Sequence, residues 1–105
     1  MWVNNETGTI QPINELSDIA RKRHIRFHCD AVQAVGKLKI NLKEQSISTL
    51  SASAHKFYGP KGVGFLYINK NVNLSPILFG GHQEKGIFPG TENLPSIIAM
   101  TKALS

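Results

Sequence analysis

The sequence predicts an α/β domain with a largely parallel β-sheet and flanking helices. Two observations carry this prediction. Short apolar segments of strand length alternate along the chain with segments whose apolar residues recur at helical spacing. Polar or glycine-rich stretches follow the expected strands, where open α/β sheets hold their ligands.

The first part of the chain is predicted to hold a strand end, a loop and a helix. Trp2 and Val3 have the apolar character of the end of a buried strand. Residues 4–9 are polar and turn-rich, so we expect a loop there. A helix is predicted over residues 12–23, because Pro12 suits a first helical turn and apolar residues then recur at helical spacing.

Three strands are expected in the middle of the chain. The first covers residues 25–29, which are short and partly apolar. After Asp30, residues 31–35 have helical character. Residues 47–54 and 62–68 read as the second and third strands.

The last part of the chain is predicted to be irregular before a final helix. A turn is expected at residues 69–73, and residues 75–92 hold four glycines and two prolines. Irregular segments of that length are often functional. Asn93 and Pro95 are typical of a helix start, and the helix that follows keeps an apolar face. We therefore expect residues 1–105 to form a single partial domain, truncated at both ends.

Composition and charge argue against several function classes. An apolar content of 41% and a charged content of 18% are typical of a folded globular chain, and no apolar run has the length of a membrane span. The densest basic run, Arg21–Arg26, is expected at a helix end rather than in a nucleic-acid site. The N-terminus lacks a secretory pattern and Cys29 is the only cysteine, so the sequence predicts a cytoplasmic or organellar location.

Lys56 is the most informative candidate for chemistry. It follows a small-residue segment of strand character and enters a loop rich in glycine and proline. A rigid base and an open mouth suit an amine that forms a Schiff base. The alternatives are a solvated surface lysine and the rival amine of Lys61, which lies in a more mobile loop between Pro60 and Gly62.

Polar residues near the strand ends are candidate partners of Lys56. Asp30 follows a strand, and Gln33 shares its side if the segment turns helically. A carboxylate beside a pyridine nitrogen keeps the nitrogen protonated, so that the ring accepts electrons. Ser53 and His55 share one face of a strand, where a hydroxyl and an imidazole suit a phosphate. Asp30 alone also fits a helix N-cap, and Gln33 a surface side chain.

Two loops add further candidates. In the loop at residues 4–8, an amide such as that of Asn5 suits a cofactor ring or a carboxylate. In residues 80–93, glycines allow backbone N–H groups to approach an anion, and Thr91 adds a hydroxyl. Ordinary turn chemistry is the alternative for both loops.

A metal site is a further alternative. His28, Asp30, His55 and His82 have residue types that suit zinc, but no pair of them has a motif spacing. We therefore expect no metal site.

Four blocks of sequence, taken in order, resemble one family. They are Val3-Asn4-Asn5-Glu6-Thr7-Gly8, His28-Cys29-Asp30-Ala31-Val32-Gln33, His55-Lys56-Phe57-Tyr58-Gly59-Pro60-Lys61-Gly62 and Gly80-Gly81-His82-Gln83-Glu84-Lys85-Gly86. With these blocks the sequence resembles the cysteine desulfurases of the NifS/IscS type, which are fold-type I pyridoxal-phosphate enzymes of the class V aminotransferase family. The resemblance covers essentially all 105 residues and implies the cofactor-lysine portion of the large domain.

The resemblance implies roles toward pyridoxal 5'-phosphate. Lys56 matches the lysine that binds the cofactor covalently, Asp30 the partner of the pyridine nitrogen, and Gln33 the contact to the phenolic oxygen. Asn5 matches the asparagine near that oxygen and the substrate carboxylate.

The phosphate group of the cofactor has its own implied ligands. Ser53 and His55 match phosphate ligands within the subunit. Thr91 matches the threonine that, in family homodimers, reaches the phosphate in the partner subunit's site.

The resemblance also implies a reaction. L-cysteine would yield L-alanine and an enzyme persulfide, whose sulfur passes to an acceptor or scaffold protein for Fe–S cluster assembly or thio-modification. It implies no direct contact with nucleic acid or membrane. The family's reactive cysteine and carboxylate-binding arginine lie downstream, and Cys29 is expected to be a buried structural thiol facing away from Asp30. We therefore expect this chain alone to be inactive.

Two departures from the family pattern and one alternative stay open. His82 stands where a third glycine is usual, and Phe88 and Pro89 replace a more polar pair. Phe88 removes a cation near the phosphate contact shared by the dimer. The alternative is a non-catalytic fragment or truncated homologue with a structural or interaction role. Exposed sheet edges and apolar helix faces predict that the chain alone associates or aggregates.

Overall fold

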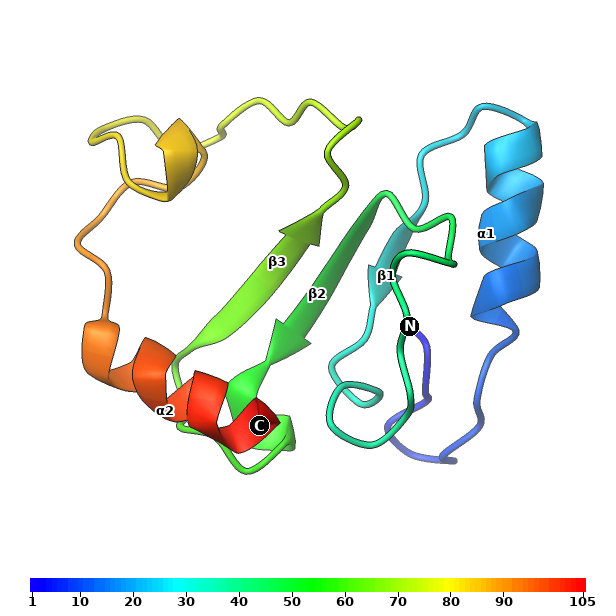
Figure 1. Cartoon of the computed structure of the whole chain (residues 1–105), viewed down its shortest axis with the longest axis horizontal. Helices are drawn as coiled ribbons and strands as arrows, with labels where there is room; N and C mark the ends of the chain where they lie inside the picture. Colours follow the sequence, from blue (N-terminus) through cyan, green and yellow to red (C-terminus); the bar gives the residue numbers. More distant parts are fainter.

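The computed structural model describes residues 1–105, which form a three-stranded sheet with two α-helices (Figure 1). The elements in chain order are α1 (Ile13–Lys22), β1 (His28–Asp30), β2 (Thr49–Ser53), a 3₁₀ helix (Ala54–Lys56), β3 (Gly64–Ile68), a second 3₁₀ helix (Glu84–Gly86) and α2 (Leu94–Leu104). Neither α-helix is long and apolar enough to cross a lipid bilayer.

The sheet has the order β1-β2-β3 and is mixed. β1 and β2 are parallel, with Asp30 opposite Ser51, whereas β2 and β3 are antiparallel, with Ser53 opposite Gly64. The short connection after β2 returns the chain as an antiparallel neighbour, while the longer segment after β1 allows a parallel crossover. The predicted α/β class is therefore confirmed, with one antiparallel edge strand.

Helix α1 matches its predicted extent and ends in a Schellman motif. His24 adopts the left-handed conformation (φ 58°). The His24 N–H donates to the Arg21 carbonyl at 3.0 Å, and the Ile25 N–H donates to the Ala20 carbonyl at 2.9 Å. Because Ile25 belongs to this helix end, β1 begins at His28 and not at the predicted residue 25.

Two other local predictions are wrong in detail. Trp2 and Val3 do not form a strand: Val3 pairs with Ile10 in an isolated bridge only. Residues 31–35 form a turn and not a helix. The Val35 N–H donates to the Ala31 carbonyl at 3.0 Å, but Gly36 is in the left-handed region, so the helical hydrogen bonding does not continue past this turn.

The core is formed by β1 and β2 together with residues from α1, α2, the N-terminal segment and the segments that follow β1 and β2. Twelve buried residues form it: Trp2, Ile13, Cys29, Ala31, Ala34, Val35, Ile47, Leu50, Ala52, Ala54, Phe57 and Met100. Met100 is the only buried residue of α2, whose first turn is capped by the Asn93 side chain, which accepts from the Ser96 N–H at 3.3 Å.

Residues 75–92, here called the arm, extend from the body as the predicted long irregular segment. No hydrogen bond joins the arm to the sheet or to α1. Ile77 and Phe79 are 90% and 85% exposed. This apolar exposure is the physical basis for the expected self-association, which stays a prediction.

Candidate functional site

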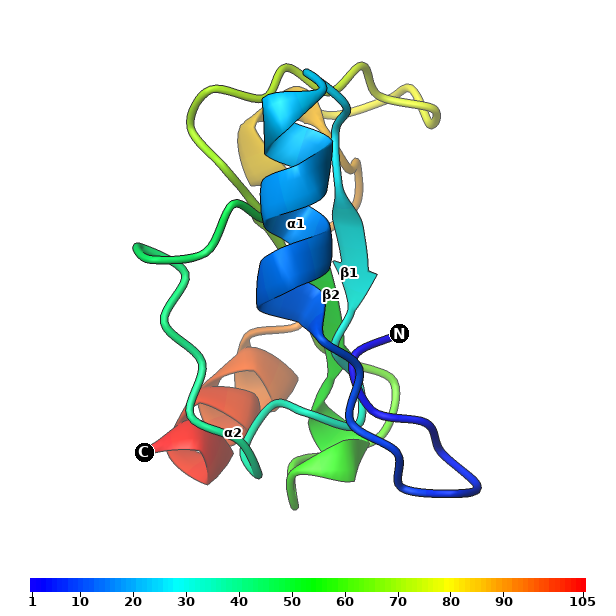
Figure 2. The same cartoon turned by 90° about the vertical axis from the view of Figure 1, so that its right-hand side faces the viewer.

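Three chain segments meet at the carboxyl end of the parallel strands. The Ala31 N–H donates to the Ser51 carbonyl at 2.9 Å, and the Trp2 N–H donates to the Asp30 carbonyl at 2.7 Å. Figures 1 and 2 show the loop after Val3, the turn after β1 and the 3₁₀ helix after β2 at this same end of the sheet, low in both views. We call this the strand-end site.

Lys56 ends the 3₁₀ helix that follows β2, on a well-packed base. The Phe57 and Gly59 N–H groups both donate to the Ala54 carbonyl, at 3.0 and 2.9 Å. Ala54 and Phe57 are buried, at 0% and 2% exposure, whereas Lys56 itself is exposed. The Lys56 amine has neither a hydrogen bond nor an ion pair. The Lys56 amine is thus free on a hydrogen-bonded turn, and its role as a Schiff-base amine stays a prediction.

The turn after Asp30 packs directly against the Lys56 turn. At Gly36 an added Cβ would lie 2.6 Å from the Cβ of Phe57. Only a residue without a side chain permits this approach. Gly36 and Phe57 were missed as site-shaping residues by sequence reasoning, because nothing in the sequence shows that residues 21 positions apart are in contact.

Ser53 and His55 form a pair beside Lys56. The Ser53 Oγ lies 2.8 Å from the His55 Nδ1. The prediction that they share a face of one strand is wrong, because β2 ends at Ser53 and His55 belongs to the 3₁₀ helix. The tighter turn brings the two side chains together instead. One group donates to the other across this contact, and the other keeps an O–H or N–H that can donate to an anion.

Asp30 and Gln33 both have structural contacts. The Asp30 Oδ1 accepts from the Val32 N–H at 2.9 Å, so Asp30 does cap the turn after β1. Its second carboxylate oxygen has no partner in the protein and can accept from a ligand. The Gln33 Oε1 accepts from the Lys37 Nζ at 3.3 Å, which leaves the amide nitrogen of Gln33 available.

In the loop after Val3, Asn4 rather than Asn5 stabilises the turn. The Asn4 Oδ1 accepts from the N–H groups of Glu6 and Thr7, both at 2.9 Å. Asn5 is exposed and its side chain forms no hydrogen bond. The turn chemistry that was the alternative for this loop therefore belongs to Asn4, and Asn5 is free to bind a ligand.

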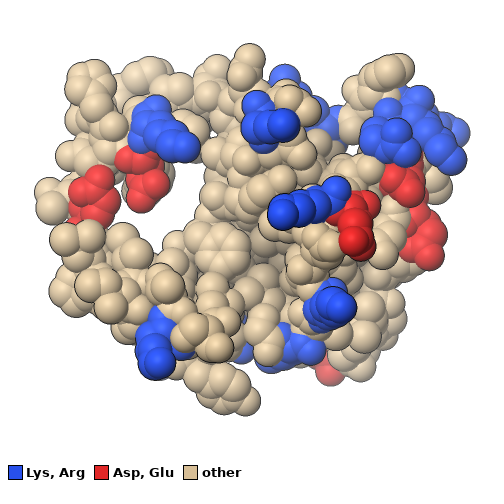
Figure 3. Space-filling view, viewed as in Figure 1, with Lys and Arg blue, Asp and Glu red and all other residues tan.

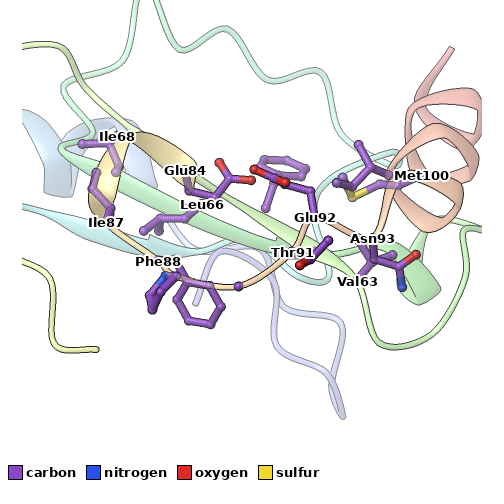
Figure 4. A pocket seen from close by; sticks show the side chains of 15 residues that line it. Val63, Leu66, Ile68, Glu84, Ile87, Phe88, Thr91, Glu92, Asn93 and Met100 are labelled. Carbon is purple, nitrogen blue, oxygen red and sulfur yellow. The ribbon is translucent and has the colours of Figure 1, made fainter. Parts of the chain in front are cut away.

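Thr91 lies apart from the other predicted site residues. It lines a groove of about 500 Å³ between β3, the arm and α2. Figure 4 shows Thr91 beside Phe88 and Glu92, with Leu66 of β3 and Met100 of α2 on the walls. None of Asn5, Asp30, Gln33, Ser53, His55 and Lys56 lines this groove.

Cys29 is buried, as predicted. It is 1% exposed, and burial raises the pKa of its thiol, with the nearby Asp30 carboxylate acting in the same direction. A thiol in this environment is a poor nucleophile.

The residues of the metal alternative and the arginines have separate places in the structure. No group of three His, Cys, Asp or Glu side chains lies close enough to hold a metal ion, so the four residues of the metal alternative are not brought together. Arg21 pairs with Asp18 at 3.5 Å, and the Arg26 Nη1 donates to the Asn73 carbonyl at 3.2 Å, both outside the strand-end site.

Comparison with known proteins identifies the family of this chain. The model of the aminotransferase class-V family matches residues 1–105. The chain belongs to the aminotransferase class-V family. The predicted resemblance is therefore confirmed.

Relatives of this class-V chain are named cysteine desulfurases. One from Sinorhizobium fredii is 55% identical over 98% of this chain and 27% of that protein. The cysteine desulfurase IscS of Dictyoglomus turgidum is 55% identical over 99% of this chain and 26% of that protein. The class-V chain thus spans about a quarter of the length of these curated relatives.

Solved structures confirm the fold. A structure of SspA in complex with cysteine is 44% identical with a TM-score of 0.94, covering 98% of this chain and 30% of that one. A NifS-like protein is also 44% identical with a TM-score of 0.94, covering 99% of this chain and 29% of that one. The class-V chain therefore has the backbone of the corresponding part of these larger folds.

Proposed function

We propose that this chain is the cofactor-lysine segment of a pyridoxal-phosphate-dependent cysteine desulfurase. The observation that carries the proposal is the free Lys56 amine on a buried, hydrogen-bonded turn. The Ser53–His55 pair lies next to it, and the turn after Asp30 packs against its base. The proposal extends to the domain, which we take to be one part of a larger pyridoxal-phosphate-binding domain.

The donor set of the strand-end site fits pyridoxal 5'-phosphate. Ser53 and His55 present an anion-binding pair for the phosphate. The unpartnered oxygen of Asp30 suits a protonated pyridine nitrogen. The amide nitrogen of Gln33 is free to donate to the phenolic oxygen of the cofactor, and Asn5 would lie near that oxygen and the substrate carboxylate.

The chain's own residues would hold the cofactor and move protons. When bound, pyridoxal 5'-phosphate supplies an electron sink for charge that develops on the substrate carbon. Lys56 would bind the cofactor through Nζ and then act as general acid and base at that carbon. Asp30 would keep the pyridine nitrogen protonated.

In the whole protein, the substrate would be L-cysteine. Its carbon–sulfur bond breaks, the sulfur bonds to a reactive protein thiolate as a persulfide, and the carbon takes up a proton to give L-alanine. Buried Cys29 does not suit this thiolate role, so we assign it to another part of the protein. The persulfide sulfur would pass to an acceptor or scaffold protein, and we propose a cytoplasmic location.

Thr91 has a separate place in the proposal. Thr91 lines a groove to which none of the strand-end residues contributes, which supports a role toward the phosphate of a partner subunit in a homodimer. Phe88, beside it in the groove, contributes no charge to that contact.

Covalent mapping tests the assignment of Lys56. The chain is incubated with pyridoxal 5'-phosphate, reduced with borohydride, digested, and examined by mass spectrometry. We expect the label on Lys56, its loss in Lys56→Ala, and its retention in the matched variant Lys61→Ala. Label that persists in Lys56→Ala, or that is spread over exposed lysines, would contradict the proposal.

A turnover measurement tests the alternative of a non-catalytic fragment. We expect these residues alone to release no sulfide or alanine from L-cysteine. Release of both, in equal amounts and dependent on Lys56, would exclude the non-catalytic alternative outright.

A further inference from the structure

A basic patch surrounds the end of α1. It consists of Arg21, Lys22, Arg23, Arg26 and Lys70, all exposed. Figure 3 shows Lys and Arg side chains gathered at the upper right, over the end of α1. This end of α1 lies at the opposite end of the molecule from the strand-end site in Figures 1 and 2.

Asp18 offsets part of the charge of the patch, since it attracts both Arg21 and Lys22, whereas Arg23, Arg26 and Lys70 have no ion pair. The chain has one ion pair, between Arg21 and Asp18. The Arg26 Nη1 donates to the Asn73 carbonyl, which joins the turn that carries Lys70 to the segment that follows α1. Lys22 and Arg23 have no side-chain hydrogen bond.

The helix dipole does not account for the whole patch. The dipole acts within the last turn of a helix, and Arg23 and Arg26 lie beyond the last helical residue of α1, Lys22. Cations gathered on one surface create a positive potential that attracts and orients an anionic partner.

Exposed aliphatic side chains lie among these cations. Ile19 and Ile25 are 51% and 59% exposed. Helical spacing places Ile19 on the same side of α1 as Lys22 and Arg23. Protein interfaces combine such apolar contacts with a charged rim, whereas nucleic-acid surfaces place aromatic side chains between cations for base stacking. Residues 13–26 contain no Phe, Tyr or Trp.

We propose that the basic patch, together with Ile19 and Ile25, docks an acidic segment of another polypeptide that carries interspersed aliphatic residues. Acidic side chains of the partner pair with the Arg and Lys side chains, and its aliphatic residues cover the two isoleucines. Because the patch is at the far end from Lys56, a docked partner leaves the strand-end site open.

Charge reversal with a matched control tests the electrostatic part. The probe is a fluorescent peptide of Glu-Asp pairs separated by leucines, titrated with the chain. Lys22→Glu/Arg23→Glu should weaken binding by at least about tenfold. Lys85→Glu/Lys102→Glu makes the same change in net charge at two other exposed sites, one also in the last turn of a helix, and should change affinity by less than about twofold. Equal weakening by the two variants, or no binding of the peptide, would overturn the proposal.

Side-chain truncation tests the apolar part. Ile19→Ser/Ile25→Ser should lower the affinity for the leucine-containing peptide about fivefold or more. The same variant should not change the affinity for a peptide made only of Glu and Asp, since that peptide has no aliphatic side chain to cover the isoleucines. An equal loss of affinity for both peptides would contradict the assigned role of the isoleucines.

A competition experiment distinguishes the partner class. A single-stranded oligonucleotide of equal charge should bind more weakly than the leucine-containing peptide. If it binds more tightly, and Lys22→Glu/Arg23→Glu abolishes that binding, the patch is a nucleic-acid surface and the proposal is wrong. None of these outcomes depends on cofactor binding at Lys56, so they stand apart from the mapping experiment above.

Discussion

Replacing Gly36 by alanine tests the contact that joins the Asp30 turn to the Lys56 turn. Gly36 has φ 77°, a conformation that costs an alanine about 1–2 kcal/mol. Alanine has less conformational entropy than glycine in the unfolded chain, and this difference offsets about 0.5–1 kcal/mol of that cost. The new Cβ would also lie 2.6 Å from the Cβ of Phe57. That atom is fixed to the backbone of a buried residue, so the turn itself must move, at a cost of about 1–3 kcal/mol.

Gly62 provides the matched control. Its φ is 79°, nearly the same as that of Gly36, but an added Cβ would meet nothing within 4 Å. Gly62→Ala should therefore lower the free energy of unfolding by the backbone cost alone, about 0–1.5 kcal/mol. Gly36→Ala should lower it by about 1–3 kcal/mol more.

Urea unfolding followed by tryptophan fluorescence measures both values. Trp2 is the only tryptophan and is 6% exposed, so its emission reports the loss of the core. Equal destabilisation by Gly36→Ala and Gly62→Ala would refute the reasoning, because it would mean that the two turns are not in contact.

Three further predictions concern α1, Cys29 and the Asp18–Ser46 contact. His24→Gly should raise the free energy of unfolding by about 0.5–1 kcal/mol, because glycine adopts the left-handed helix-end conformation without strain; a decrease in urea unfolding would contradict this. Cys29 should react with iodoacetamide about 100-fold more slowly in the native chain than in urea, since its thiol is buried and its pKa raised; equal rates would show an open core. Ser46→Ala should raise the pKa of Asp18 in a carboxyl NMR titration, because the Ser46 hydroxyl, which donates at 2.8 Å, holds that pKa below its ordinary value. A folded-state pKa below the unfolded one stabilises the chain above about pH 4 and loses that contribution as the pH falls further; an unchanged Asp18 pKa in Ser46→Ala would reject that cause.

Sequence reasoning was most reliable where the relevant interactions are local. The spacing of Ile13 and Ala20 predicted α1 to within a residue or so at each end, since helical hydrogen bonds join residues four apart. Lys56 was predicted after a strand and before a glycine- and proline-rich loop, and it stands there in the structure. The order of the four sequence blocks was enough to predict the family.

The same reasoning failed where one short segment had two conformations to choose from. Residues 31–35 have helical character, yet Gly36 ends the segment after one turn. Ser53 and His55 alternate as strand residues would, yet the chain tightens into a 3₁₀ helix between them. In both cases the surrounding packing decides, because local propensities differ by about 1 kcal/mol or less, whereas burial of one large apolar side chain contributes about 1.5–3 kcal/mol.

By itself, the sequence determined the two α-helices, the approximate places of the three strands, the family and the candidate residues of the strand-end site. Only the tertiary structure decided that Gly36 meets Phe57, that β3 returns antiparallel to β2, and that Thr91 lines a groove to which Lys56 does not contribute. The physical reason is the range of the interactions. A helix or a turn is held by contacts within a few residues of sequence, whereas these three relationships join segments that meet only after the whole chain has packed.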